Sequence, residues 1–103
     1  MEKRLFRRKI KRLGITFSDG NIEHNGISSD FSCNGLFIKT RNGFKEGTLL
    51  KLMIEIEDNT IPLTGIVARL VKPGIATKKS GMGIELTVTH PYYDNLVREL
   101  ILN

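Results

Sequence analysis

Apolar and polar residues alternate with a period of two along most of the chain. The pattern is clearest from Leu50 to Glu57, where apolar side chains alternate with Lys51, Met53 and Glu55. Because successive side chains of a strand point to opposite faces, this segment predicts a strand with one buried face. Turn-forming residues separate it from similar segments, which favours antiparallel pairing. The same pattern predicts further strands over 14–18, 22–31, 36–40, 60–71 and 82–88.

The alternation changes phase within the segment 60–71. Ile61 and Leu63 share one parity, whereas Ile66 and Leu70 follow the other, and Gly65 stands at the change. A glycine at a change of parity is typical of a β-bulge or of a barrel corner. We therefore expect an irregularity at Gly65, with Ile66 and Leu70 turned to the buried face after it.

The last segment of the chain has a different period. Leu96, Val97, Leu100 and Ile101 follow helical spacing, and Pro91 suits a first helical position. We expect one C-terminal helix that covers one opening or one face of the sheet. Six short strands at regular spacing and a single helix predict a mostly-β fold, a small antiparallel barrel or rolled sheet.

Composition places the chain among single-domain globular proteins and offers little for catalysis. Its 103 residues, 40% apolar and 26% charged, are enough for one core. One cysteine excludes an internal disulfide, and His24 and His90 lack the spacing of a metal site. Nucleophile-elbow, phosphate-loop and paired-histidine motifs are absent from the sequence. We therefore expect a protein that is not an enzyme and has no metal or cofactor.

The hydropathy pattern indicates neither a membrane span nor a secretion signal. No apolar run approaches the roughly 18 residues that a membrane helix needs. The N-terminus is basic but lacks the apolar stretch of a signal peptide. We expect a cytoplasmic protein.

The net charge of +5 is concentrated at one end of the chain. Residues 1–12 carry seven Lys and Arg side chains against one Glu, a net charge of +6, whereas residues 13–103 carry nine against ten. This contrast divides the chain into a basic N-terminal arm (1–12) and a nearly neutral body (13–103). Self-repulsion predicts that the arm is flexible. A DNA-binding domain more often spreads its cations over a whole docking face.

Two arginines of the arm have a spacing that suits a small anionic ligand. Arg8 and Arg12 are four residues apart, which brings two guanidinium groups to one side. A guanidinium binds phosphate or the edge of guanine, and it stacks on purines. Charge alone gives comparable weight to a solvated tail, a nucleic-acid contact, nucleotide binding and an amphipathic membrane helix. The apolar side of that helix would consist of Leu5, Phe6, Ile10 and Leu13.

A second polar cluster, Asp30 to Gly35, lies at the end of a predicted strand. Asp30 and Ser32 are two residues apart and share a face, while Phe31 faces the other way. A carboxylate can accept hydrogen bonds from the N1–H and N2–H₂ edge of guanine, and Gly35 lets the backbone turn or approach a ligand. The alternative is a polar turn in which Asp30 and Ser32 bond only to the local backbone.

Together the two clusters resemble the signature of the PilZ domain family, an RxxxR segment followed by (D/N)x(S/A)xxG. Arg8 and Arg12 match the first motif, and 17 residues separate it from the second motif, which begins at Asp30. The resemblance covers nearly the whole chain, although Leu86 stands where the family more usually has Phe. The other similar segments are Gly35–Ile38, Gly65–Arg69, Gly81–Leu86 and Leu96–Leu102.

This resemblance implies a six-stranded PilZ-type β-barrel that binds cyclic di-GMP, a bacterial second messenger. In the family the motif arginines grip the ligand, the Asp and Ser contact a guanine, and the Gly shapes the turn. A basic residue before the first arginine tends to accompany two intercalated ligand molecules rather than one. The arm closes over the barrel on binding, which implies a sensor that signals to an unidentified effector protein. The implied ligand-binding residues are Arg7, Arg8, Arg12, Asp30, Ser32 and Gly35.

Two other functions are consistent with the sequence. One is a PilZ-fold interaction module in pilus or motility assembly that needs no ligand, although such members typically lack the arginines that this chain keeps. The other is a nucleic-acid binder that uses the basic arm. Five Phe, two Tyr and no Trp offer few stacking platforms, which argues against nucleic acid. We expect a monomer or a weak homodimer.

Overall fold

The computed structural model describes residues 11–73 and 80–102, which form six strands and one helix. The predicted mostly-β fold is confirmed, and each strand begins and ends within one residue of its predicted bounds. Most of the predicted flexible arm, including Arg7 and Arg8, lies outside the described residues. The elements are β1 (Leu13–Ser18), β2 (Glu23–Ser32), β3 (Gly35–Lys39), β4 (Leu49–Ile56), β5 (Asn59–Val71), β6 (Gly81–Val88) and α1 (Pro91–Leu102).

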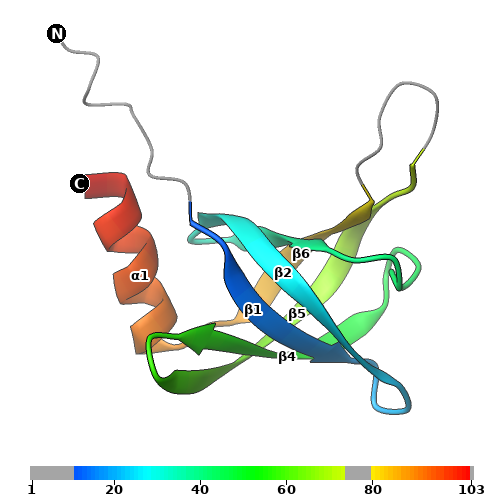
Figure 1. Ribbon diagram of the computed structural model, residues 1–103, viewed down its shortest axis with the longest axis horizontal. Coiled ribbons are helices and arrows are strands. Elements are labelled where there is room, and N and C mark those ends of the chain that lie inside the picture. The colour runs from blue at the N-terminus through cyan, green and yellow to red at the C-terminus, as the bar shows by residue number, and fades with distance from the viewer. Residues whose placement is uncertain (1–10, 74–79, 103) are drawn as a thin grey trace, which may run out of the picture.

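The strands close into a barrel in the order β1-β2-β3-β6-β5-β4, with every neighbouring pair antiparallel. Consecutive strands form two three-stranded meanders, β1–β2–β3 and β4–β5–β6. The meanders join along two lines, where β1 pairs with β4 and β3 pairs with β6. Helix α1 lies across one end of the barrel (Figure 1).

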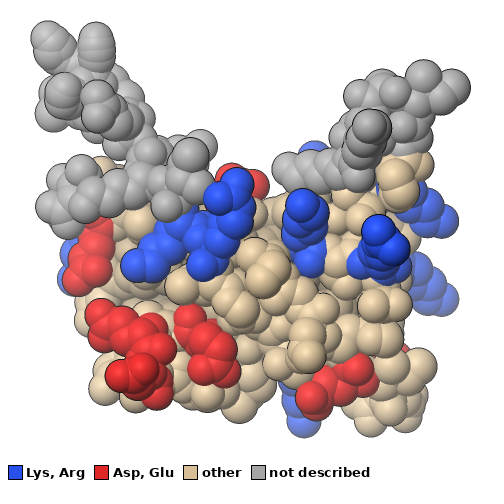
Figure 2. All heavy atoms as spheres, in the orientation of Figure 1, with Lys and Arg blue, Asp and Glu red and all other residues tan. Residues whose placement is uncertain are grey.

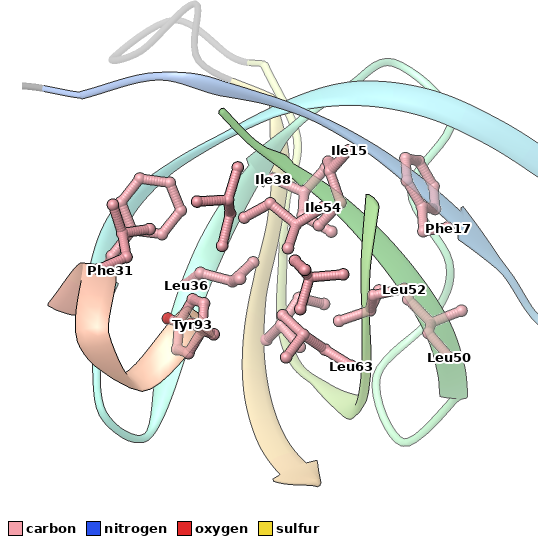
Figure 3. Packing of buried hydrophobic residues seen from close by; sticks show 14 of the residues in the cluster. Ile15, Phe17, Phe31, Leu36, Ile38, Leu50, Leu52, Ile54, Leu63 and Tyr93 are labelled. Atoms are coloured by element: carbon pink, nitrogen blue, oxygen red, sulfur yellow. The ribbon is translucent and has the colours of Figure 1, made fainter. Parts of the chain in front are cut away.

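The barrel interior is filled by the inward residues of all six strands and of the helix (Figure 3). β4 shows the predicted alternation, because Leu50, Leu52 and Ile54 are fully buried while the residues between them are exposed. Phe17 from β1 is also fully buried. A barrel of this size leaves room inside for side chains only, so ligands must bind outside the core or at an end.

The irregularity predicted at Gly65 is present, but its effect on the core differs from the prediction. The β5–β6 register shifts at Thr64/Gly65 and again at Val67/Arg69. Between the two shifts the original parity persists, so Val67 is buried and Ile66 stays half-buried. The prediction that Ile66 turns inward is therefore wrong, whereas Leu70, beyond the second shift, does pack against the core. The change of phase in the sequence does not reveal that β5 contains two register shifts instead of one.

Helix α1 begins where Pro91 predicts, and His90 caps it. The His90 Nδ1 accepts a hydrogen bond from the Tyr92 N–H at 3.1 Å, and the His90 carbonyl accepts one from the Asp94 N–H at 2.9 Å. Its inward stripe is Tyr93, Leu96, Val97 and Leu100, and Ile101 is exposed, contrary to the predicted spacing. Among the described residues no helix is long and apolar enough to cross a membrane.

Candidate ligand-binding site

The second sequence motif begins in a bulge at the end of β2. Ser29 pairs with Phe37 and Ser32 pairs with Gly35, so two residues of β2 stand opposite one residue of β3. Asp30 occupies the left-handed region with φ 54°, which Asp tolerates better than most residues because its short side chain bonds locally. The bulge keeps Asp30 exposed while Phe31 enters the core. The predicted division between an exposed Asp30 and an inward Phe31 is confirmed.

Ser32 closes the tight turn that follows the bulge. Its Oγ accepts hydrogen bonds from the N–H groups of Asn34 at 3.3 Å and Gly35 at 3.1 Å. The same hydroxyl lies 3.3 Å from the Gly35 carbonyl, to which it donates. Every hydrogen-bonding capacity of this hydroxyl is therefore engaged within the turn. Ser32 shapes the backbone between Asp30 and Gly35.

Gly35 is required by close packing of two strands. The turn has Cys33 and Asn34 at its tip, and Gly35 is already the first residue of β3. Its φ is not positive, so conformational freedom does not explain it. A Cβ at this position would lie 2.3 Å from the carbonyl oxygen of Ile84 in β6. Glycine therefore lets β3 and β6 approach each other beneath the turn.

Helix α1 supports the turn from inside the barrel through Tyr93. The Tyr93 hydroxyl lies 2.8 Å from the Ser32 carbonyl and 3.0 Å from the Gly35 carbonyl, so its single proton is shared between them. Its ring meets the Phe31 ring edge-on, with centroids 6.2 Å apart (Figure 3). Burial raises the pKa of this hydroxyl well above its ordinary value, so it stays protonated and able to donate.

Above the turn, the outer wall of the barrel is hollowed into an open groove of about 450 Å³. Asp30 and Ser32 line it, as their common face predicts, and Gly35 lines it too. The groove extends from β2 across β3 and β6 to β5, so both meanders contribute to it. Its lining residues are Asp30, Ser32, Asn34, Gly35, Leu36, Phe37, Ala68, Arg69, Gly83, Ile84 and Glu85.

Arg69 and Glu85 are groove residues that sequence reasoning does not assign to the site. Arg69 pairs with Gly83 across β5 and β6, and the missing side chain at Gly83 leaves the strand surface open beside the Arg69 Cβ. The charged groups that line the groove are thus two carboxylates, Asp30 and Glu85, and one cation. Only the strand register, which sequence patterns do not give, brings Arg69 to the same wall as Asp30.

β1 begins beside the part of β2 that leads into the second motif. Leu13 pairs with Ser28, and the buried Ser28 Oγ donates to the Leu13 carbonyl at 2.8 Å. Since β1 and β2 are antiparallel, the start of β1 lies nearest the end of β2 that carries Asp30. Arg12 is exposed at this point. On the face that Figure 2 shows, most Lys and Arg side chains form a band across the upper half, nearer the start of β1, and most Asp and Glu side chains lie in the lower half.

The described residues contain no group of three His, Cys, Asp or Glu side chains that could hold a metal ion. Cys33 is exposed at the tip of the turn. The site therefore consists of a polar groove, a strained carboxylate-bearing bulge and an adjoining cationic segment. These parts make the outer wall of the barrel the candidate ligand-binding site.

The sequence matches the PilZ domain family over residues 2–102, so the chain belongs to this family. PilZ domains are binding and adaptor modules associated with cyclic di-GMP. Among solved structures, the fold is similar to that of the Bacillus subtilis inhibitor of motility (MotI/DgrA), with a TM-score of 0.72 and 20% sequence identity. That match covers 98% of this chain and 50% of the other, so the chain spans about half the length of that protein. No curated protein matches.

Proposed function

We propose that this protein is a bacterial cyclic di-GMP receptor that acts in the cytoplasm through a separate effector protein. Arg8 and Arg12 bind the ligand phosphates, and Asp30 accepts hydrogen bonds from a guanine edge. Ser32 and Gly35 hold the turn that presents Asp30. Closure of the arm over the groove changes the surface that the effector meets.

The observation that carries this proposal is the position of Asp30. The bulge holds its carboxylate outward in the groove, where a guanine can offer N1–H and N2–H₂ together. A strand surface without bulky side chains at Gly35 and Gly83 gives a flat base room to lie against the wall. The Arg69 guanidinium on the same wall supplies a plane on which a purine stacks.

Charge balance explains why the arm is needed for binding. The charged groups that line the groove are two carboxylates and one guanidinium, which repel rather than attract a ligand with two phosphates. Arg12 alone cancels the resulting net charge of −1, and Arg8 together with Arg12 makes it positive. Arg12 directly precedes Leu13, which pairs with Ser28 near the strand end that carries Asp30. Ligand binding therefore depends on ordering the arm against the barrel, and that coupling makes binding a switch.

Calorimetric titration with cyclic di-GMP, GMP and a short oligonucleotide tests the receptor assignment. Arg12→Ala and Arg8→Ala each remove a charge-assisted hydrogen-bond donor, and we expect a loss of roughly tenfold to 100-fold in cyclic di-GMP affinity. Lys11→Ala and Lys9→Ala remove the same charge at neighbouring positions and serve as matched controls. The stoichiometry of the same titration tests Arg7, for which we expect two ligands per chain.

Each alternative function gives a distinct outcome in this titration. Equal losses of affinity in the Arg and Lys variants would show that the arm acts only as a diffuse positive charge. Tighter, steeply salt-dependent binding of the oligonucleotide would identify a nucleic-acid binder. A folded wild-type chain that binds none of the three would identify a ligand-independent interaction module.

Base readout by Asp30 is tested by comparing cyclic di-GMP with cyclic di-AMP. Asp30→Gly removes the carboxylate and tolerates the left-handed backbone, which Ala would strain by about 1 kcal/mol. We expect this variant to lose most of its preference for guanine while it keeps its phosphate contacts. Asp30→Asn retains one acceptor oxygen, so it should recover part of the preference. Parallel losses for both dinucleotides would contradict a base contact at Asp30.

A further inference from the structure

Tyr93 makes more contacts with the 30–35 motif than are needed to fill the core. Its ring packs against Phe31, and its hydroxyl reaches the carbonyls of Ser32 and Gly35, which stand at the two ends of the tight turn. The side chain is 0% exposed. A Phe would fill the same space, so the hydroxyl has a purpose other than packing.

The geometry points to that purpose. The turn from Ser32 to Gly35 has four backbone carbonyls, of which those of Ser32 and Gly35 converge on one buried proton. The Asn34 carbonyl accepts a hydrogen bond from the Leu86 N–H at 2.8 Å. The turn is thus tied to α1 at both ends and to β6 at its tip. Since Asp30 precedes this turn in a strained bulge, fixing Ser32 also fixes the backbone from which the Asp30 carboxylate projects.

We propose that Tyr93 is a positioning residue of the ligand site, which holds the Asp30 bulge in its binding conformation and joins the site to helix α1. This inference rests on the proposed function. Because coupling between two sites is reciprocal, a ligand that fixes the turn also fixes the Tyr93 anchor of α1. The effect of ligand binding in the groove is then transmitted through the turn to helix α1.

Tyr93→Phe removes the hydroxyl and keeps the ring, and Tyr92→Phe is the matched control. Tyr92 is half-exposed on the adjacent helix position, with its ring 5.3 Å from that of His90. In folded protein we expect Tyr93→Phe to weaken cyclic di-GMP binding on the order of tenfold. Tyr92→Phe should bind as the wild type does. Wild-type affinity in folded Tyr93→Phe would overturn the inference.

A double-mutant cycle separates positioning from general destabilisation. If Tyr93 acts through the bulge, Tyr93→Phe should cost little further affinity in a chain that already carries Asp30→Gly. Losses that simply add would show that Tyr93 affects binding by another route, and would overturn the positioning role.

Amide exchange in the free protein tests the same role without any ligand. The Gly35 N–H bonds to Ser32 Oγ and the Leu86 N–H bonds to the Asn34 carbonyl, so both report on the turn. Both should exchange faster in Tyr93→Phe than in Tyr92→Phe. Unchanged exchange would overturn the inference even if the wild type binds no ligand, whereas absence of wild-type binding alone would overturn the proposed function.

If Tyr93→Phe does not fold, a milder probe keeps the question decidable. The chain has two tyrosines, so fluorotyrosine in the Tyr92→Phe background labels Tyr93 alone. We expect its fluorine resonance to shift when cyclic di-GMP is added, because the turn that it contacts becomes fixed. A resonance that stays in place at saturating ligand would contradict a link between the groove and α1.

Discussion

At the scale of single residues, the three positions of the second motif meet three different physical demands. Asp30 tolerates a positive φ and leaves a carboxylate outside the barrel. Ser32 uses its one hydroxyl to close the turn. Gly35 is small because a β6 carbonyl lies where its side chain would be. Part of this motif is therefore required by the path of the backbone and not by contacts with a ligand.

The demand at Gly35 predicts a specific loss of stability. Gly35→Ala would place a Cβ 2.3 Å from the Ile84 carbonyl oxygen, so β3 and β6 must separate. We expect a cost of roughly 2 kcal/mol, in the range of overpacked cores, and a Tm lower by roughly 10 °C. Thermal unfolding followed by circular dichroism measures it.

Gly14→Ala is the control for that substitution. Gly14 lies in β1, has no positive φ, and an added Cβ would meet only Glu55 Cγ at 4.0 Å. We expect its Tm to match or slightly exceed the wild-type value. A similar decrease of Tm in both variants would indicate that alanine destabilises these strands in general, and not that Gly35 lies at a close contact.

At the scale of elements, α1 is an anchor for the binding turn as well as a cover for one barrel end. Its inward stripe joins the strand core at Leu96 and Val97, and Tyr93 reaches the turn between β2 and β3. Helix α1 therefore packs against both the strand core and the turn. Its docking on the barrel should depend on the protonation of the Tyr93 hydroxyl, which makes the polar contact with the turn.

Alkaline pH gives a direct measure of that docking. Burial raises the pKa of Tyr93 above its ordinary 10.0, so the native state keeps a proton that the unfolded state releases. Its contribution to stability is therefore complete below pH 10.0 and is lost as pH rises beyond it. Urea unfolding across this range should show a steeper decline for wild type than for Tyr93→Phe. Parallel declines would contradict a buried, protonated Tyr93, because the two chains differ only in the Tyr93 hydroxyl.

At the scale of the whole molecule, patterns within single segments predict the elements and not the contacts between them. Alternation along β4 locates that strand because one face of it is buried along its full length. The same reasoning misplaces Ile66, because two bulges lie close together in β5. Arg69 joins the site through pairing with β6, and Tyr93 joins it through the docking of a helix. Both depend on register and packing between segments distant in the chain.

The charge distribution also combines a pattern within one segment with a contact between segments. The sequence places +6 on residues 1–12, and the structure pairs Leu13, the next residue, with Ser28 near the strand end that carries Asp30. Neither charge counts nor motif spacing indicates which strand lies beside the start of β1. The antiparallel pairing of Leu13 with Ser28 does so, because it sets the start of β1 beside the last residues of β2.

The two meanders of the barrel have a consequence for the order of folding. Pairing within each meander joins strands that follow one another, whereas the β1–β4 and β3–β6 pairings close long loops and form slowly. The groove straddles the β3–β6 line, with Asp30 on one side and Arg69 on the other. Neither half-barrel carries the site, and its support from Tyr93 comes from residues synthesised after both. Under the proposed function, binding therefore requires the complete barrel, and we expect an incompletely folded chain not to bind the ligand.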